Sequence, residues 1–296
     1  MRSSSLISAA LSGAGDAYDR ANELEAALKH YELHASLEAG TARGRGSLVR
    51  ATRILVFLGR FRQGGLIADR LLIKLDELTP FERIAVLSAK ALALLERGDD
   101  THASNFIEKG RDVVESNRLD AAGRVPRDLA QLYYALGESR RLRAERIVFV
   151  PMPPSFGYVL EARCQLLLDA QSAYSDSMRA YDAHWSAMAG FRVAELYQRL
   201  HQDLLAVKTP PSADTERKRQ LFEGAVRLRY SVLLNKARGM AEHTLAMAQR
   251  TGEHSDWVER TRKALNGIEK SIAEEQAALA RLPYKREDFE AYFAEM

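Results

Sequence analysis

The sequence predicts an all-α protein. Apolar residues recur at steps of three and four, the spacing of a buried helix face, and no alternating strand pattern is present. Glycine and proline gather between the periodic segments. The longest such segment, Phe156–Val207, contains no proline and predicts a helix about 75 Å long that the rest of the chain must cover. Gly190 marks either close contact with another helix or a split into two helices. The predicted apolar face comprises Leu160, Cys164, Leu167, Tyr174, Met178, Tyr181, Trp185, Ala189, Val193, Leu196, Leu200 and Leu204.

The composition excludes several classes of function. The chain has 296 residues, 46% hydrophobic and 28% charged, as in soluble globular proteins. A net charge of +3, with basic residues spread along the chain, argues against a nucleic-acid partner. The single cysteine, Cys164, permits no internal disulfide and is expected to be a small core residue. The sequence contains no run of 18 apolar residues, so it predicts no membrane span. The chain as written is expected to be cytoplasmic.

The amino-terminal half predicts short helices. A first helix is expected over residues 16–38, followed by a loop over 40–46 that contains three glycines. Two helix pairs should follow, one at 48–58 and 64–78 and the other at 80–97 and 102–117. Thr79, Pro80 and Glu82 have the spacing of a capping box and predict the start of the third of these helices.

These pairs resemble tetratricopeptide repeats, the helix-turn-helix units of α-solenoids. The segments Leu58–Gly64 and Arg97–Ala103 are similar to the turn between the two helices of a repeat, with small packing residues at Ala68, Ala91 and Ala103. The resemblance implies a degenerate α-solenoid of antiparallel helix pairs over residues 1–150. A concave surface that binds a protein or peptide partner would follow from that fold.

The carboxy-terminal half predicts a bundle of long helices over residues 151–296. A helix at 126–148 is followed by a proline-rich connector, Phe149–Ser155, which we take as the domain boundary. After the long helix, Pro210 and Pro211 allow a helix at 213–250 to fold back antiparallel. A capping box at Asp256–Glu259 should open a third helix, which Pro283 ends before an amphipathic tail at 285–296.

This half also resembles the carboxy-terminal region of tetratricopeptide-repeat scaffold proteins of gliding myxobacteria. The residues that carry the resemblance are Tyr181–Ala189, Ala194–Tyr197, Asn235–Ala237 and the helix that contains Trp257. It implies protein–protein assembly in a cell-envelope or motility machinery. It also implies a periplasmic location if the chain is a fragment of an exported protein.

No motif predicts catalysis, a cofactor or a metal. His30 and His34 have a metal-binding spacing, but no third ligand is identifiable, so we interpret them as ordinary helix residues. Gly44–Gly46 lacks the Lys-Ser or Lys-Thr of a phosphate-binding loop and is expected to be a connector. No serine lies in a nucleophile elbow.

The sequence therefore predicts a non-enzymatic scaffold or adaptor. Candidate partner-binding residues are Arg140 and Arg141, in a basic run with Arg143 and Arg146, and the tail aromatics Phe289, Tyr292 and Phe293. The basic run is alternatively a solvated helix face, and the aromatics alternatively fold back as a cap. Two other functions stay open: a regulatory solenoid that senses a small ligand or peptide, and a helical enzyme with an unrecognised site.

Overall fold

The computed structural model describes residues 2–120 and 125–295, and in these ranges it contains twelve α-helices, two short 3-10 segments and no strand. The all-α prediction is confirmed. The chain forms two compact units: unit 1 comprises residues 1–139 and 175–185, and unit 2 comprises residues 140–174 and 186–296. This division differs from the predicted boundary at residue 150, because the connector lies inside unit 2.

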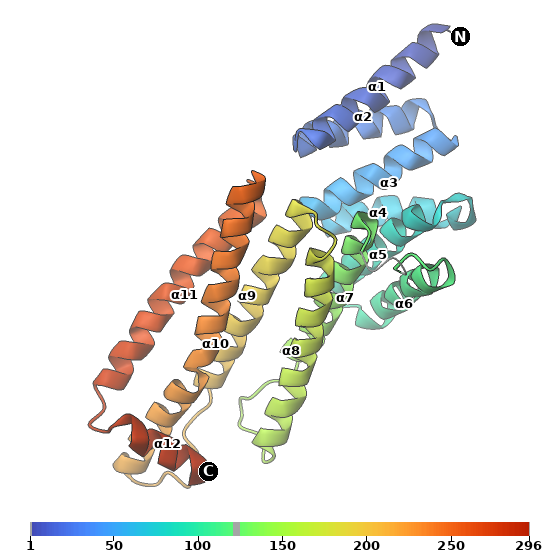
Figure 1. The fold of residues 1–296 in the computed structure, drawn as a ribbon. Coiled ribbons are helices and arrows are strands. Elements are labelled where there is room, and N and C mark those ends of the chain that lie inside the picture. The colour runs from blue at the N-terminus through green and yellow to red at the C-terminus, as the bar shows by residue number, and fades with distance from the viewer. Residues whose placement is uncertain (1, 121–124, 296) are drawn as a thin grey trace. The chain divides into compact units, whose positions relative to one another are not determined.

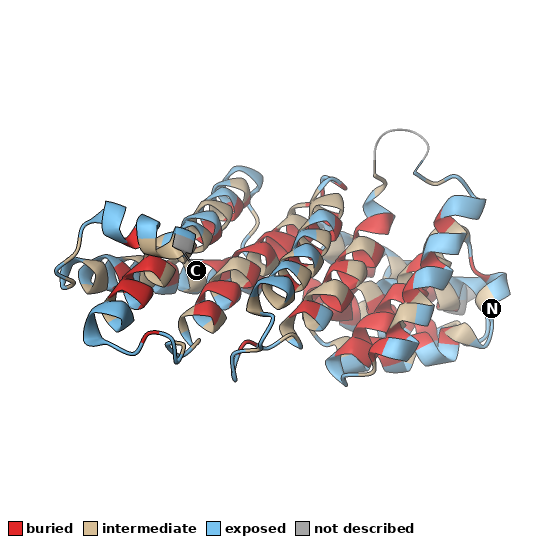
Figure 2. Ribbon diagram, turned by 90° about the horizontal axis from the view of Figure 1, so that it is seen from below, coloured by how far each residue is buried: buried red, intermediate tan, exposed pale blue. Residues whose placement is uncertain are grey.

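Unit 1 is built mainly from short helices that pack in chain order. Each of the first five packs on the next one, and the third also packs on the fifth (Figure 1). Their inner faces are buried, as the red segments of Figure 2 show. The helices are α1 (Arg2–Arg20), α2 (Leu24–Leu37), α3 (Ala42–Phe57), α4 (Phe61–Leu72), α5 (Pro80–Glu96) and α6 (Asp100–Ser116).

The first helix boundaries differ from the prediction. The expected single helix over 16–38 is wrong, because the chain turns between α1 and α2 with Asn22 at a φ of 60°. The expected loop over 40–46 is also wrong, because α3 begins at Ala42. Thr41 makes this early start possible: its hydroxyl accepts a hydrogen bond from the Gly44 amide at 3.1 Å and caps the helix.

The predicted start of α5 is confirmed. Thr79 Oγ1 accepts from the Glu82 amide, and the Glu82 carboxylate accepts from the Thr79 amide at 2.9 Å, so both halves of the capping box are present. Pro80 occupies the first turn, where its missing N–H costs no hydrogen bond. Gly98, at a φ of 78°, makes the predicted turn to α6.

The expected single helix over 156–207 is wrong, and so is a split at Gly190. The segment forms α8 (Phe156–Met178) and α9 (Ala183–Leu205), and each contributes residues to both units, as does α7 (Ala130–Glu145). Between α8 and α9, Tyr181 adopts a φ of 56°. Asp182 then caps α9 by accepting from the Trp185 amide at 3.0 Å.

Trp185 belongs to the core of unit 1. Its side chain is 1% exposed, and its ring lies 4.8 Å from the ring of Phe57 and 5.7 Å from that of Tyr134. Residues 175–185, the last of unit 1 along the chain, therefore pack into the same core as α3 and α7.

Unit 2 contains the long antiparallel helices α10 (Glu216–Thr251) and α11 (Asp256–Ala280), with α12 (Arg286–Glu295) packed on α10 (Figure 1). Gly252 ends α10 in the left-handed conformation, which favours glycine. The capping box expected at Asp256–Glu259 does not form. Ser255 is the cap residue, its hydroxyl makes no capping bond, and the Glu253 carboxylate accepts from the Ser255 amide instead.

Gly190 is a point of close helix contact in unit 2. A Cβ atom added there would lie 2.1 Å from Oγ1 of Thr244, so the Thr244 side chain of α10 packs directly against the backbone of α9 at this point. Of the two interpretations of Gly190 from the sequence, close contact is the one confirmed.

Candidate protein-interaction site

The main candidate site is an apolar pocket in unit 2 with a volume of about 640 Å³. Its walls come from the Phe149–Ser155 connector, the first turns of α8, the end of α9, the first half of α10, and α12. The lining comprises Met152, Pro154, Ser155, Phe156, Gly157, Tyr158, Leu160, Leu204, Val207, Phe222, Val226, Arg229, Tyr230 and Phe293. We call this set the apolar pocket.

Large apolar side chains stand exposed at this pocket. Tyr158 is 75% exposed and Met152 is 42% exposed, although both line the apolar pocket. Val150, next to the pocket along the chain, is 46% exposed. Contiguous apolar surface of this kind is typical of a binding site, whereas single exposed apolar residues are not informative.

Arg163 fixes the connector wall of the apolar pocket. This side chain is 1% exposed and donates a hydrogen bond from Nη1 to the Ile147 carbonyl at 2.9 Å. Its guanidinium also forms an ion pair with Asp203 of α9 and lies 4.9 Å from the centre of the Phe149 ring. Removing a partner from a buried cation costs free energy, so these three contacts are expected to persist. Arg163 therefore holds Ile147 and Phe149 against α8 and α9.

Arg229 is the only charged residue among the described residues that line the apolar pocket. Its guanidinium lies 5.2 Å from the centre of the Phe293 ring, and Lys236, two turns further along α10, lies 5.3 Å from the Tyr197 ring. Both side chains are exposed, and neither has a carboxylate partner among the side chains that the structure describes. Burial raises the pKa of Tyr230 beside Arg229, so the phenol is neutral at physiological pH.

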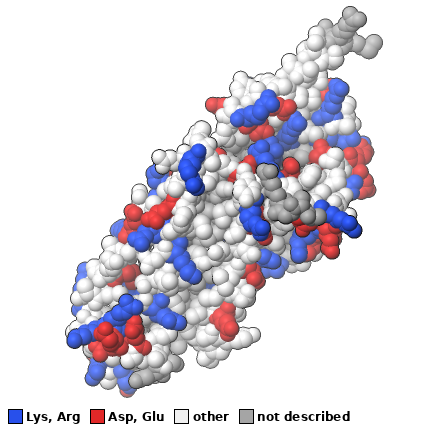
Figure 3. Space-filling model, viewed as in Figure 1, with Lys and Arg blue, Asp and Glu red and all other residues white. Residues whose placement is uncertain are grey.

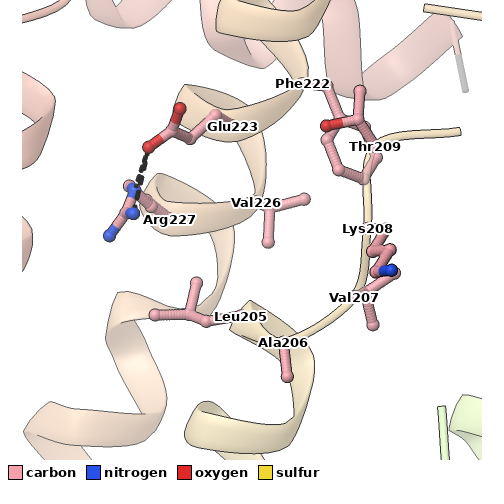
Figure 4. Close-up of a pocket in the computed structure, with 9 residues that line it drawn as sticks. All are labelled: Leu205, Ala206, Val207, Lys208, Thr209, Phe222, Glu223, Val226 and Arg227. Atoms are coloured by element: carbon pink, nitrogen blue, oxygen red, sulfur yellow. Dashed lines mark hydrogen bonds and ion pairs between the residues drawn. The ribbon is translucent and has the colours of Figure 1, made fainter. Parts of the chain in front are cut away.

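A smaller pocket of about 360 Å³ lies beside the apolar pocket and shares Val207, Phe222 and Val226 with it (Figure 4). Its charged lining residues are Lys208, Glu223 and Arg227, and the last two form the ion pair drawn in Figure 4 at 3.0 Å. Arg227 also binds Glu275 of α11 at 2.8 Å. The Arg227 guanidinium is therefore compensated by two carboxylates, in contrast to Arg229.

The predicted basic site does not present free cations at its two named arginines. Arg140 donates to the Asp169 carbonyl at 2.9 Å, and Arg141 pairs with Glu145 at 2.8 Å with only 11% of its side chain exposed. Both guanidinium groups therefore bind acceptors within unit 2.

The predicted aromatic tail site is divided by the structure. Phe289 is 4% exposed and packs with Leu221 and Ala225 of α10, so its ring is part of the core. Tyr292 and Phe293 are half-buried at the edge of the same cluster, and Phe293 lines the apolar pocket. The tail folds back on α10 in this structure, and Phe293 is the predicted residue that lies in the candidate site.

The two histidines with metal-binding spacing face different surroundings. His30 Nδ1 hydrogen-bonds the Ala26 carbonyl at 2.7 Å, whereas His34 is buried between Ser8 at 3.1 Å and Ser47 at 2.8 Å. Within residues 2–120 and 125–295, no group of three His, Cys, Asp or Glu side chains is placed to hold a metal ion.

The contact between Ser8 and His34 is not arranged as a nucleophile and its base. The Ser8 hydroxyl donates to Glu38 Oε1 at 2.5 Å, so its proton points away from the imidazole. A serine nucleophile needs that proton on the histidine side. This polar chain instead joins α1, α2 and α3.

Sequence reasoning missed most of the apolar pocket. Arg229 and Lys236 were detectable as cations seven residues apart on a predicted helix. The meeting of Met152, Leu204, Phe222 and Phe293 depends on tertiary packing and has no signal in the sequence.

No family model matches the chain, and no curated protein matches it either. Among the described helices, none is long and apolar enough to cross a membrane. On the face shown in Figure 3, basic and acidic side chains are interspersed and no large surface of one sign is formed.

Proposed function

We propose that the protein is a non-enzymatic interaction module whose apolar pocket binds an apolar segment of a partner protein. The observation that carries the proposal is the exposure of Tyr158 and Met152 at a pocket whose lining is almost entirely uncharged. We further propose that α1 to α6 are degenerate tetratricopeptide-like pairs. The packing of each helix on its neighbour, and of α3 on α5, supports a solenoid of this kind.

The test compares affinity purification with three versions of the tagged protein from its own cells. The double variant Met152→Asp/Tyr158→Asp places charge at two exposed positions of the pocket. A matched control, Ile73→Asp, changes a side chain in unit 1 that is 83% exposed. We expect a stoichiometric partner with the wild type and the control, and at least a tenfold loss of that partner with the pocket variant. Equal recovery with all three versions would contradict the proposed site.

A second function, sensing of a small amphipathic ligand, is favoured by the size of the apolar pocket. Its volume of about 640 Å³ lies within the range of small-molecule sites, roughly 300–1,000 Å³. A thermal-shift screen of apolar acids, with the pocket variant as control, tests this function.

A further inference from the structure

Resting on the proposed function, we infer that the partner segment is an acidic amphipathic helix. The inference comes from the charges that the protein presents beside the apolar pocket. Arg229 and Lys236 are exposed cations on α10, and no carboxylate among the side chains that the structure describes pairs with either. An anionic partner would supply the missing charges, whereas a cationic one would be repelled.

The spacing of the two cations indicates the form of the partner. Positions seven residues apart lie on one face of a helix, separated by about 10.5 Å along its axis. Arg229 lies over the Phe293 ring and Lys236 over the Tyr197 ring, so each cation has its own place for a carboxylate. Two carboxylates seven residues apart on a second helix, laid along α10, have the same separation and match both cations.

The surface between these cations suits an apolar helix face. At one end is the apolar pocket, with Arg229 over the Phe293 ring. At the other end, Tyr197 of α9 lies under Lys236, and its hydroxyl donates to Gln171 of α8. Leu160 of α8 and Tyr230 of α10 both line the apolar pocket, so α8 and α10 flank the same surface. A helix that presents apolar residues every three or four positions would bury them here.

The test uses two synthetic 18-residue helical peptides with the same leucine face. One carries glutamate at two flanking positions seven residues apart, and the other carries lysine there. We expect the glutamate peptide to bind the wild-type protein at least tenfold more tightly than the lysine peptide, measured by fluorescence anisotropy at low salt. In Arg229→Glu/Lys236→Glu the preference should reverse. Lys270→Glu, an exposed change on α11, is the matched control and should leave the preference unchanged.

Three outcomes would overturn the inference. They are binding of both peptides with equal affinity, binding of neither, and saturable binding of a fluorescent fatty acid with no peptide binding. The last would favour a small amphipathic ligand. These outcomes are distinct from a failure of the proposed function. A cellular partner whose binding depends on Tyr158 and Met152 but not on Arg229 and Lys236 would overturn the inference and leave the proposed function standing.

Discussion

At Gly190, α9 and α10 of unit 2 leave no space for a side chain. We predict that Gly190→Ala lowers the free energy of unfolding by about 1–3 kcal/mol, because its Cβ would overlap Oγ1 of Thr244. Urea denaturation followed by circular dichroism measures this change.

Two further variants test the cause. Gly239→Ala, in α10 with no atom within 4 Å of the added Cβ, should be neutral or stabilising by up to about 1 kcal/mol. Thr244→Ala should reduce the cost of Gly190→Ala in the double variant. If Gly190→Ala and Gly239→Ala had equal effects, steric overlap would not be the explanation.

His201 predicts a pH dependence of stability. It is 2% exposed, its Nε2 has no hydrogen-bond partner among the described residues, and burial lowers its pKa below 6.5. Glu275 nearby acts to raise that pKa and Arg227 to lower it further. The folded protein therefore binds this proton less readily than the unfolded chain does. The stability that the neutral imidazole contributes is complete above pH 6.5 and is lost as the pH falls from 6.5 through the folded-state pKa.

The measurement is the free energy of unfolding between pH 7.5 and 5. We expect it to decrease toward pH 5 in the wild type and to decrease less in His201→Leu, which cannot be protonated. The lowered pKa values of Glu38 and Asp99 act only at lower pH, below their ordinary values of 4.5 and 3.8. An unchanged slope in His201→Leu would exclude His201 as its source.

Among the helices, α5 and α11 offer a matched comparison of caps. Thr79 forms a complete capping box, whereas the Ser255 hydroxyl makes no capping bond and is buried without a partner among the described residues. We expect Thr79→Ala to lower the free energy of unfolding by about 0.5–2 kcal/mol. Ser255→Ala should change it little or raise it, because a buried unsatisfied hydroxyl is removed. Chemical denaturation of both variants provides the measurement, and similar losses would contradict this assignment of the caps.

Helix starts and ends with local signals could be predicted from the sequence. Thr79 and Gly98 act within one turn of the chain, and the structure confirms both. The break between α8 and α9 was missed because residues 179–182 contain neither glycine nor proline. Asp182 marks the break, because it caps α9 and forms an ion pair with Arg127. That ion pair exists only in the folded protein, so the sequence could not show it.

On the scale of the molecule, the division into units follows packing and not the proline-rich connector. Ser177 donates to the Ala130 carbonyl at 2.9 Å, and Trp185 packs on Phe57, so residues after the connector complete unit 1. A sequence pattern cannot show this, because apolar periodicity tells which face is buried but not which helix covers it. The apolar pocket escaped prediction for the same reason.

Trp185 provides the test at this scale. We expect Trp185→Ala to lower the free energy of unfolding by about 3–5 kcal/mol, the usual cost of truncating a buried tryptophan. Hydrogen exchange should become faster around Phe57 in α3 and Tyr134 in α7. Trp185→Phe, which keeps an aromatic ring, should cost less. Exchange that changed only within α9 would indicate that Trp185 does not hold these helices together.

The packing of α12 on α10 also makes ligand binding measurable by proteolysis. Phe289 anchors α12 beside Gly224, while Phe293 on the same helix lines the apolar pocket. Anything that binds there stabilises the docked helix by mass action. Lys285 and Arg286, exposed at its start, are trypsin sites. The rate of cleavage at these two residues should therefore fall as the pocket fills, which gives an assay for ligands that requires no label.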